Sequence, residues 1–135
     1  SLHIATQASH NGFVSELKRA LAVYGIDVVP SAAEASYSIV IVDFRQNRRI
    51  ATLNASARVA AYQLNEDVDF VITDSAGAIL TAMLTASVER SYEIEERDIL
   101  SSENEENLIK LEMRQEIVRQ ILNRLKVLPD HNKQP

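Results

Sequence analysis

A long alternation of apolar and polar residues between Tyr62 and Ile94 constrains the fold of this chain more than any other sequence feature. From Tyr62 to Thr73 most apolar side chains occupy even positions and most polar ones odd positions, and the alternation returns from Leu80 to Ile94. A period of two is typical of a β-strand with one packed face and one wet face. Asp74-Ser75-Ala76-Gly77 separates the two runs and predicts a hairpin turn. We therefore expect two long antiparallel strands that share a polar face.

Two charged residues break this pattern, because Glu66 and Arg90 occupy apolar positions of the two strands. We expect each of them to lie near a strand end or to have a partner, since an unpaired buried charge is costly. Upstream, the run 37–44 is apolar at both odd and even positions. It predicts a central strand covered on both faces, which continues to Leu53 and ends in a turn at 54–57.

The N-terminal segment predicts a strand, a helix and a second strand. Leu2–Thr6 is a short β-like run, and apolar residues then recur at helical spacing. Asn11 is the expected N-cap of this helix, and Gly25 is expected at its C′ position. Ile26–Val29 predicts a short strand, parallel to the first and reached by a right-handed crossover.

The C-terminal segment gives the strongest helical signal. Ser102-x-x-Glu105 predicts a capping box, the apolar residues from Ile109 to Leu125 step by four, and Pro129 ends the helix. The predicted order is therefore β-α-β-β-β-β-α. This is an α+β fold, with two helices packed on one face of a mixed, mostly antiparallel sheet of four to five strands. We expect a single domain over residues 1–128 and a flexible polar tail over 129–135.

The composition excludes several classes of function. The chain has 135 residues, no cysteine, three glycines and a net charge of −5. The lack of cysteine excludes disulfide scaffolds, cysteine-ligated zinc and cysteine nucleophiles, and so few glycines leave no phosphate-binding loop. An acidic chain argues against general nucleic-acid binding. His3, His10 and His131 are too scattered for a metal site, so we expect no cofactor, no metal and no catalysis.

A basic stretch stands out in this acidic chain. Arg45, Arg48 and Arg49 follow the central strand, and Arg58 lies across the predicted turn. Guanidinium groups bind phosphates and carboxylates in a bidentate manner, so the four arginines are our candidate anion-binding site. The alternative interpretation is a solvated strand edge that charge protects against aggregation.

Several short motifs, taken in order, resemble the family of the lipopolysaccharide-assembly lipoprotein LptE, also called rare lipoprotein B. The resemblance covers roughly residues 2–125, and its specific motifs lie in the second half of the chain. These are Ala61-Tyr62-Gln63-Leu64, Val68-Asp69-Phe70, Asp74-x-x-Gly77, Val88-x-Arg90-x-Tyr92, Glu103-Asn104-Glu105, Met113-Arg114 and Gln120-Ile121-Leu122-x-Arg124-Leu125.

The resemblance implies a non-enzymatic lipoprotein on the periplasmic side of the outer membrane. An acylated N-terminal Cys, which we expect upstream of Ser1, would anchor it in the membrane. It would plug the LptD β-barrel and help to deliver lipopolysaccharide to the cell surface. The resemblance also implies basic residues that contact lipopolysaccharide near Ala55 and Ser102. Arg58 and Arg49 lie near the first position, and Arg97 lies near the second.

Two other functions remain open at this point. A small periplasmic domain without a barrel partner would bind a solute or a peptide through the polar sheet face. A hydrolase would use Asp67 or Asp69 as its acid or base, although carboxylates on an exposed strand face are usually solvated.

Overall fold

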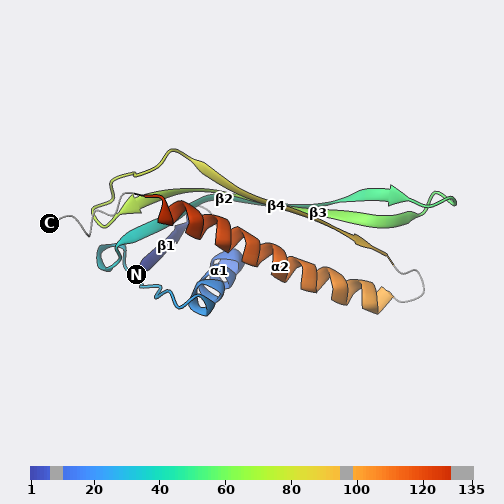
Figure 1. Cartoon of the computed structure of the whole chain (residues 1–135), viewed down its shortest axis with the longest axis horizontal. Coiled ribbons are helices and arrows are strands. Elements are labelled where there is room, and N and C mark those ends of the chain that lie inside the picture. Colours follow the sequence, from blue (N-terminus) through green and yellow to red (C-terminus); the bar gives the residue numbers. More distant parts are fainter. Residues whose placement is uncertain (7–10, 95–98, 129–135) are drawn as a thin grey trace.

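The computed structural model describes residues 1–6, 11–94 and 99–128. It contains an α+β fold, as predicted, in which both helices lie on one side of a four-stranded sheet (Figure 1). The strands follow the order β1-β2-β3-β4, with β1 parallel to β2 and the other pairs antiparallel. The elements are β1 (Leu2–Thr6), α1 (Asn11–Val23), a 3-10 turn η1 (Ala32–Glu34), β2 (Tyr37–Leu53), β3 (Val59–Asp74), β4 (Leu84–Glu93) and α2 (Ile99–Lys126).

The hairpin of β2 and β3 extends beyond the other elements. Its turn forms at the predicted place, where the amide of Ala57 donates to the carbonyl of Asn54 at 3.0 Å. The last pair between β3 and β4 joins Ala61 to Glu93, and Ala60 still accepts a hydrogen bond from Ile94, so residues 53–59 project past β4. We call residues 53–59 the hairpin tip, and Figure 1 shows it at the opposite end of the molecule from the N-terminus.

A register shift between Ile41 and Asp43 decides which residues of β2 face the helices. Before the shift, Ile39 and Ile41 are fully buried, and after it Phe44 packs against the core. The prediction of a strand covered on both faces is wrong, because both helices lie on the same side and Val40 on the other side is only half-buried. The predicted central position of β2, between β1 and β3, is confirmed.

One predicted strand does not form, and another is shorter than expected. Residues 26–29 form no strand but a single parallel bridge from Val28 to Leu2. The run that starts at Leu80 joins β4 only at Leu84, because the chain bends at residues 81–82, although Leu80 itself still donates to the carbonyl of Ile72 on β3 at 2.8 Å. The alternation therefore predicted the faces of β4 correctly and its start wrongly.

The helix ends agree with the sequence in part. Gly25 has a φ of +74°, and a Schellman motif ends α1: Gly25 donates to Ala22 and Ile26 donates to Leu21. α1 includes Asn11 as its first residue, so its N-cap position lies outside the described residues. α2 begins before Ser102, so the predicted capping box is wrong and this serine lies buried within the helix.

Further predictions fall outside the described residues, namely those on the polar tail 129–135 with its Pro129 and His131, on His10 and on the basic residue Arg97. Within the part of the chain that the structure describes, no helix is both long and apolar enough to cross a membrane.

Candidate anion-binding site and the polar sheet face

The four candidate arginines do not form one cluster. In the pairing of β2 with β3, Arg45 lies opposite Asp67 and Arg49 lies opposite Gln63, both on the outer face of the sheet, away from the helices. Arg48 lies between them in sequence and therefore faces the helices. Arg58 follows the turn of the hairpin tip, where it is exposed.

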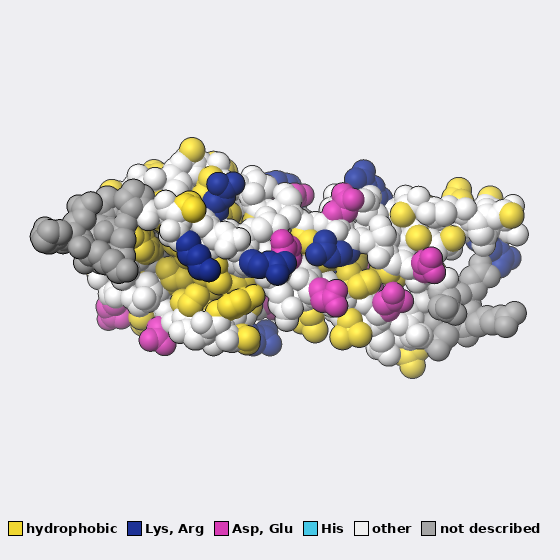
Figure 2. All heavy atoms as spheres, viewed as in Figure 1, with side chains coloured by type: hydrophobic (Ala, Val, Ile, Leu, Met, Phe, Trp, Pro, Cys, Tyr) yellow, Lys and Arg dark blue, Asp and Glu magenta, His cyan; other side chains and the backbone are white. Residues whose placement is uncertain are grey.

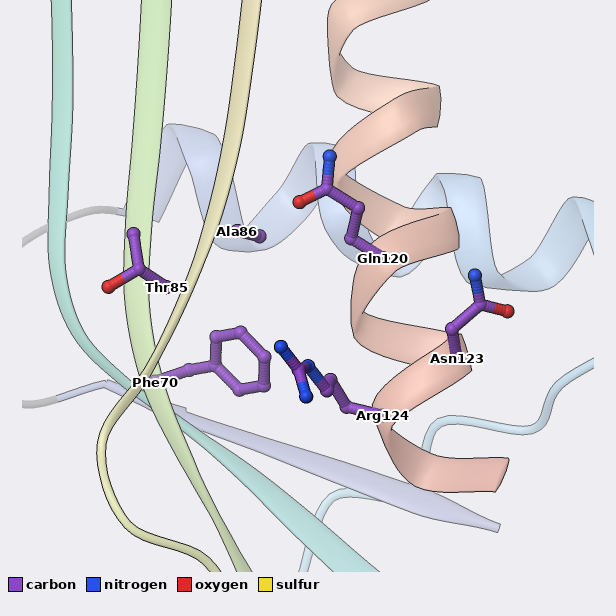
Figure 3. Close-up of a pocket in the computed structure, with 6 residues that line it drawn as sticks. All are labelled: Phe70, Thr85, Ala86, Gln120, Asn123 and Arg124. Carbon is purple, nitrogen blue, oxygen red and sulfur yellow. The ribbon is translucent and has the colours of Figure 1, made fainter. Parts of the chain in front are cut away.

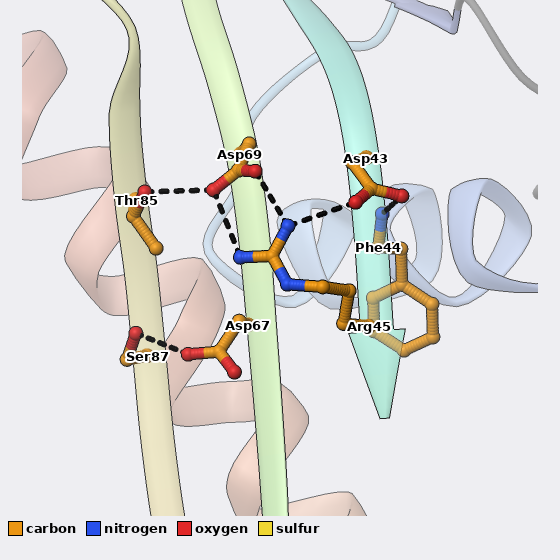
Figure 4. Close-up of polar contacts among 7 residues, drawn as sticks. All are labelled: Asp43, Phe44, Arg45, Asp67, Asp69, Thr85 and Ser87. Carbon is orange, nitrogen blue, oxygen red and sulfur yellow. Dashed lines mark hydrogen bonds and ion pairs between the residues drawn. The ribbon is translucent and has the colours of Figure 1, made fainter. Parts of the chain in front are cut away.

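Two aspartates compensate the charge of Arg45. Its guanidinium donates to Asp69 at 2.6 and 3.2 Å and to Asp43 at 2.8 Å (Figure 4). The hydroxyl of Thr85 also donates to Asp69, at 2.7 Å. The hydrogen bonds from Arg45, and then that from Thr85, lower the pKa of Asp69 below its ordinary value. Arg45 is therefore already engaged by carboxylates and is a poor ligand for a further anion.

We expect Arg45→Gln to raise the pKa of Asp69 toward its ordinary value of about 3.9. A carboxyl group with a lowered pKa in the folded state adds stability above its unfolded pKa, and this stability is lost as the pH falls through the folded pKa. The stability difference between wild type and variant should thus shrink below about pH 4. Carboxyl-carbon NMR titration measures the pKa, with Arg49→Gln as the control. An unchanged pKa in the Arg45 variant would assign the shift to Thr85 alone.

Arg48 is held on the helix side of the sheet by aromatic and acidic groups. Its guanidinium lies 4.2 Å from the centre of the Tyr62 ring, and its Nη1 lies 3.4 Å from Glu106. The hydroxyl of Tyr92 donates to the same carboxylate at 2.7 Å. Burial, followed by this hydrogen bond, raises the pKa of Tyr92 to about 12. These contacts join β2, β3 and β4 to the N-terminal half of α2, so Arg48 has a structural role.

Arg49 and Arg58 are the candidates that remain. The Nε of Arg49 donates to the neutral side chain of Gln63 at 3.0 Å, which leaves the charge of Arg49 uncompensated. No described carboxylate lies within ion-pair distance of it. Arg58 is exposed at the hairpin tip, and its backbone amide donates to Asn54 at 3.1 Å. Arg49 and Arg58 therefore stay as predicted anion-binding residues, at the base of the hairpin tip and within it.

The outer sheet face is polar, as the alternation predicts, and its side chains bond to one another. Ser87 donates to Asp67 at 2.5 Å, as Figure 4 shows, and Asn65 donates to Asn47 at 3.0 Å. These cross-strand bonds join neighbouring side chains of the outer sheet face to one another. Among the described residues, no group of three or more acidic or histidine side chains is placed to hold a metal ion.

A buried ion pair lies beneath the helices. The carboxylate of Glu66 is fully buried and accepts hydrogen bonds from Arg114 at 3.0 and 3.4 Å and from Gln46 at 3.0 Å. Arg114 also forms a close ion pair with Glu16 of α1. The expectation that Glu66 has a partner is confirmed. Arg90, in contrast, is exposed near the end of β4.

The sequence analysis missed Arg114 as the partner of Glu66. Its signal was present, because a single arginine stands inside the apolar stripe of α2, next to the fully buried Met113. The guanidinium lies 4.9 Å from the centre of the Phe13 ring and 5.2 Å from that of Phe44. Arg114 thus links α1, β2 and β3 through one side chain.

A small hollow of about 200 Å³ lies between β4 and the C-terminal half of α2 (Figure 3). Beside it, the side-chain amide of Gln120 accepts from the backbone amide of Ser87 at 3.0 Å and donates to the carbonyl of Ser87 at 2.8 Å. The walls include Phe70 of the core and Arg124 of the helix. These contacts serve the packing of α2 on β4 and assemble no reactive group.

The comparisons with known proteins agree with this architecture. The family model described as LptE, lipopolysaccharide-assembly, matches residues 1–125. The chain belongs to the LptE family. The sequence resemblance is thereby confirmed, and lipopolysaccharide assembly is the process in which the family takes part. No curated protein matches the chain in sequence.

Solved structures with the same fold include proteins from three bacteria. The rare lipoprotein B of Shewanella oneidensis has a TM-score of 0.71 at 18% identity, over 93% of this chain and 92% of its own. An uncharacterized lipoprotein B of Nitrosomonas europaea has a TM-score of 0.75 at 25% identity, over 90% and 78%. A minor lipoprotein of Acinetobacter baumannii has a TM-score of 0.68 at 20% identity, over 99% and 96%.

Proposed function

We propose that this chain is the protein part of an outer-membrane lipoprotein that plugs and supports an LptD-type β-barrel during lipopolysaccharide assembly. The observation that carries the proposal is the family match over residues 1–125. The names of the similar structures, all lipoproteins, support an N-terminal lipid anchor on the periplasmic side. The role is non-enzymatic, since a plug acts through binding alone.

The outer sheet face supports a place inside a barrel. The lumen of a large transmembrane barrel is polar, and a docking surface there must present polar groups without a large apolar patch. The face formed by β2, β3 and β4 meets this need, because Asp67, Ser87, Asn47 and Asn65 already bond to one another. Side chains that are ordered beforehand lose less entropy when a partner binds.

The hairpin tip is the proposed contact for lipopolysaccharide. The phosphates of this lipid would accept charge-assisted hydrogen bonds from Arg49 and Arg58. Arg45 and Arg48 support this region through Asp69 and Glu106. The second lipopolysaccharide contact that the resemblance implies, near Ser102, is not supported by this residue, because Ser102 is buried and uncharged.

Two measurements test this function. The tagged protein should copurify with a large outer-membrane barrel from native envelopes, and Arg49→Glu with Arg58→Glu should weaken lipopolysaccharide binding by about tenfold or more. Arg124→Glu with Lys126→Glu is the control, since it changes the net charge equally at the other end of the molecule. Purification without a barrel, together with binding of a soluble solute or peptide, would favour the alternative of a periplasmic binding domain.

A further inference from the structure

A second hollow, of about 470 Å³, lies between the two helices on the side away from the outer sheet face. Its size falls within the range of about 300–1,000 Å³ for small-molecule sites. Hydrophobic side chains gather over α1 beside α2, with lysine and arginine side chains along their border (Figure 2). The residues of the hollow on which the inference rests are Arg19, Ala20, Val23 and Tyr24 of α1 and Leu111 of α2.

The walls of this hollow expose apolar side chains that the fold does not need to expose. Val23 is 86% exposed and Leu111 is 60% exposed, although the faces of both helices that pack on the sheet are fully buried. Tyr24 adds a half-exposed ring at the end of α1. Apolar groups from two elements that converge on one hollow are typical of a binding surface.

The charges around the hollow leave one cation without a counter-ion. Arg114 is paired with Glu66 and Glu16, and Lys110, next to the hollow, lies 3.7 Å from Glu106. Arg19 has no carboxylate within ion-pair distance in the described part of the chain. It lies one helical turn before Val23, so the single uncompensated charge stands at the rim of the apolar wall.

We propose that this hollow binds a single alkyl chain that ends in an anionic group. The alkyl chain of the ligand would cover Ala20, Val23 and Leu111, and its anionic group would accept hydrogen bonds from the guanidinium of Arg19. One apolar strip with one cation at its rim is complementary to such an amphiphile. The site goes beyond the proposed function, because it lies on the helices and far from the hairpin tip (Figure 1).

Decyl phosphate below its critical micelle concentration is the probe, and amide chemical shifts of the whole protein in NMR report where it binds. We expect saturable shifts around Val23 and Leu111. Leu111→Asp should weaken binding about tenfold or more, because a charged group replaces the apolar wall. Arg19→Ala should weaken it about threefold. Ile79→Asp is the matched control, since Ile79 is 71% exposed outside the hollow, and it should leave binding unchanged.

Two further ligands separate the contribution of the alkyl chain to binding from that of the charged group. Decyl maltoside should bind more weakly than decyl phosphate, and inorganic phosphate should not shift these amides. The inference is overturned if decyl phosphate does not bind, binds elsewhere, or binds Leu111→Asp as well as wild type. Equal binding of the maltoside would also overturn it, as would binding of an acidic amphipathic helix without binding of the alkyl phosphate. Barrel copurification of Leu111→Asp tests the proposed function separately, and we expect it to be retained.

Discussion

Arg114→Met should lower the free energy of unfolding by about 3–5 kcal/mol, the largest effect that we expect from any exchange of a polar side chain. Glu66 is fully buried, and Arg114 supplies two of its three hydrogen bonds. Without the arginine, the carboxylate would remain in the core with only Gln46 as a partner. The cost arises from this unpaired charge rather than from the loss of an attractive contact, and denaturant unfolding measures it.

The double variant Glu66→Leu with Arg114→Met separates these two causes. Replacement of both charges by apolar groups of similar size is often neutral or stabilising, so we expect most of the lost stability to return. Arg124→Met is the control on the same helix, because Arg124 is exposed, and it should change stability by less than about 0.5 kcal/mol. A double variant as unstable as the single one would show that the ion pair itself is needed for folding.

Ile41→Ala should cost about 2–5 kcal/mol, whereas Val40→Ala should cost clearly less. Ile41 is fully buried under the helices, and its neighbour Val40 is half-buried on the opposite face. Truncation of a fully buried side chain leaves a cavity, but a half-exposed site is filled by water. Thermal or denaturant unfolding of both variants gives the comparison. Equal losses would mean that the outer face is covered as well, which the arrangement of the helices does not provide.

The contrast between Val40 and Ile41 also shows what the sequence could and could not predict. Strict alternation marks a strand with one wet face, and it correctly assigned Val68, Phe70 and Ile72 to the core. In β2 the run 37–44 has apolar residues at both odd and even positions, so it does not distinguish the buried face from the other one. The deciding feature is a helix layer formed by residues distant in sequence.

For the candidate arginines, the sequence could have predicted the face of the sheet on which each one lies, but not their partners on α2. Arg48 has a different parity from Arg45 and Arg49, so the period of a strand alone could have assigned it to the opposite face. The partners Glu106 and Arg114 could not be assigned, because pairing across about 50 residues depends on how α2 packs on the sheet. The predicted start of α2 was wrong because Ser102 and Glu105 have the spacing of a capping box, although both residues lie within the helix.

The contact of Gln120 with Ser87 has a consequence for the exposed edge of the sheet. β4 is the last strand of the sheet, and a bare outer edge offers a second molecule a template for strand pairing. At the middle of this edge one glutamine makes the two hydrogen bonds that an antiparallel neighbour would make. An incoming strand would have to displace it, so the molecule stays resistant to fibre-like self-association while it is alone.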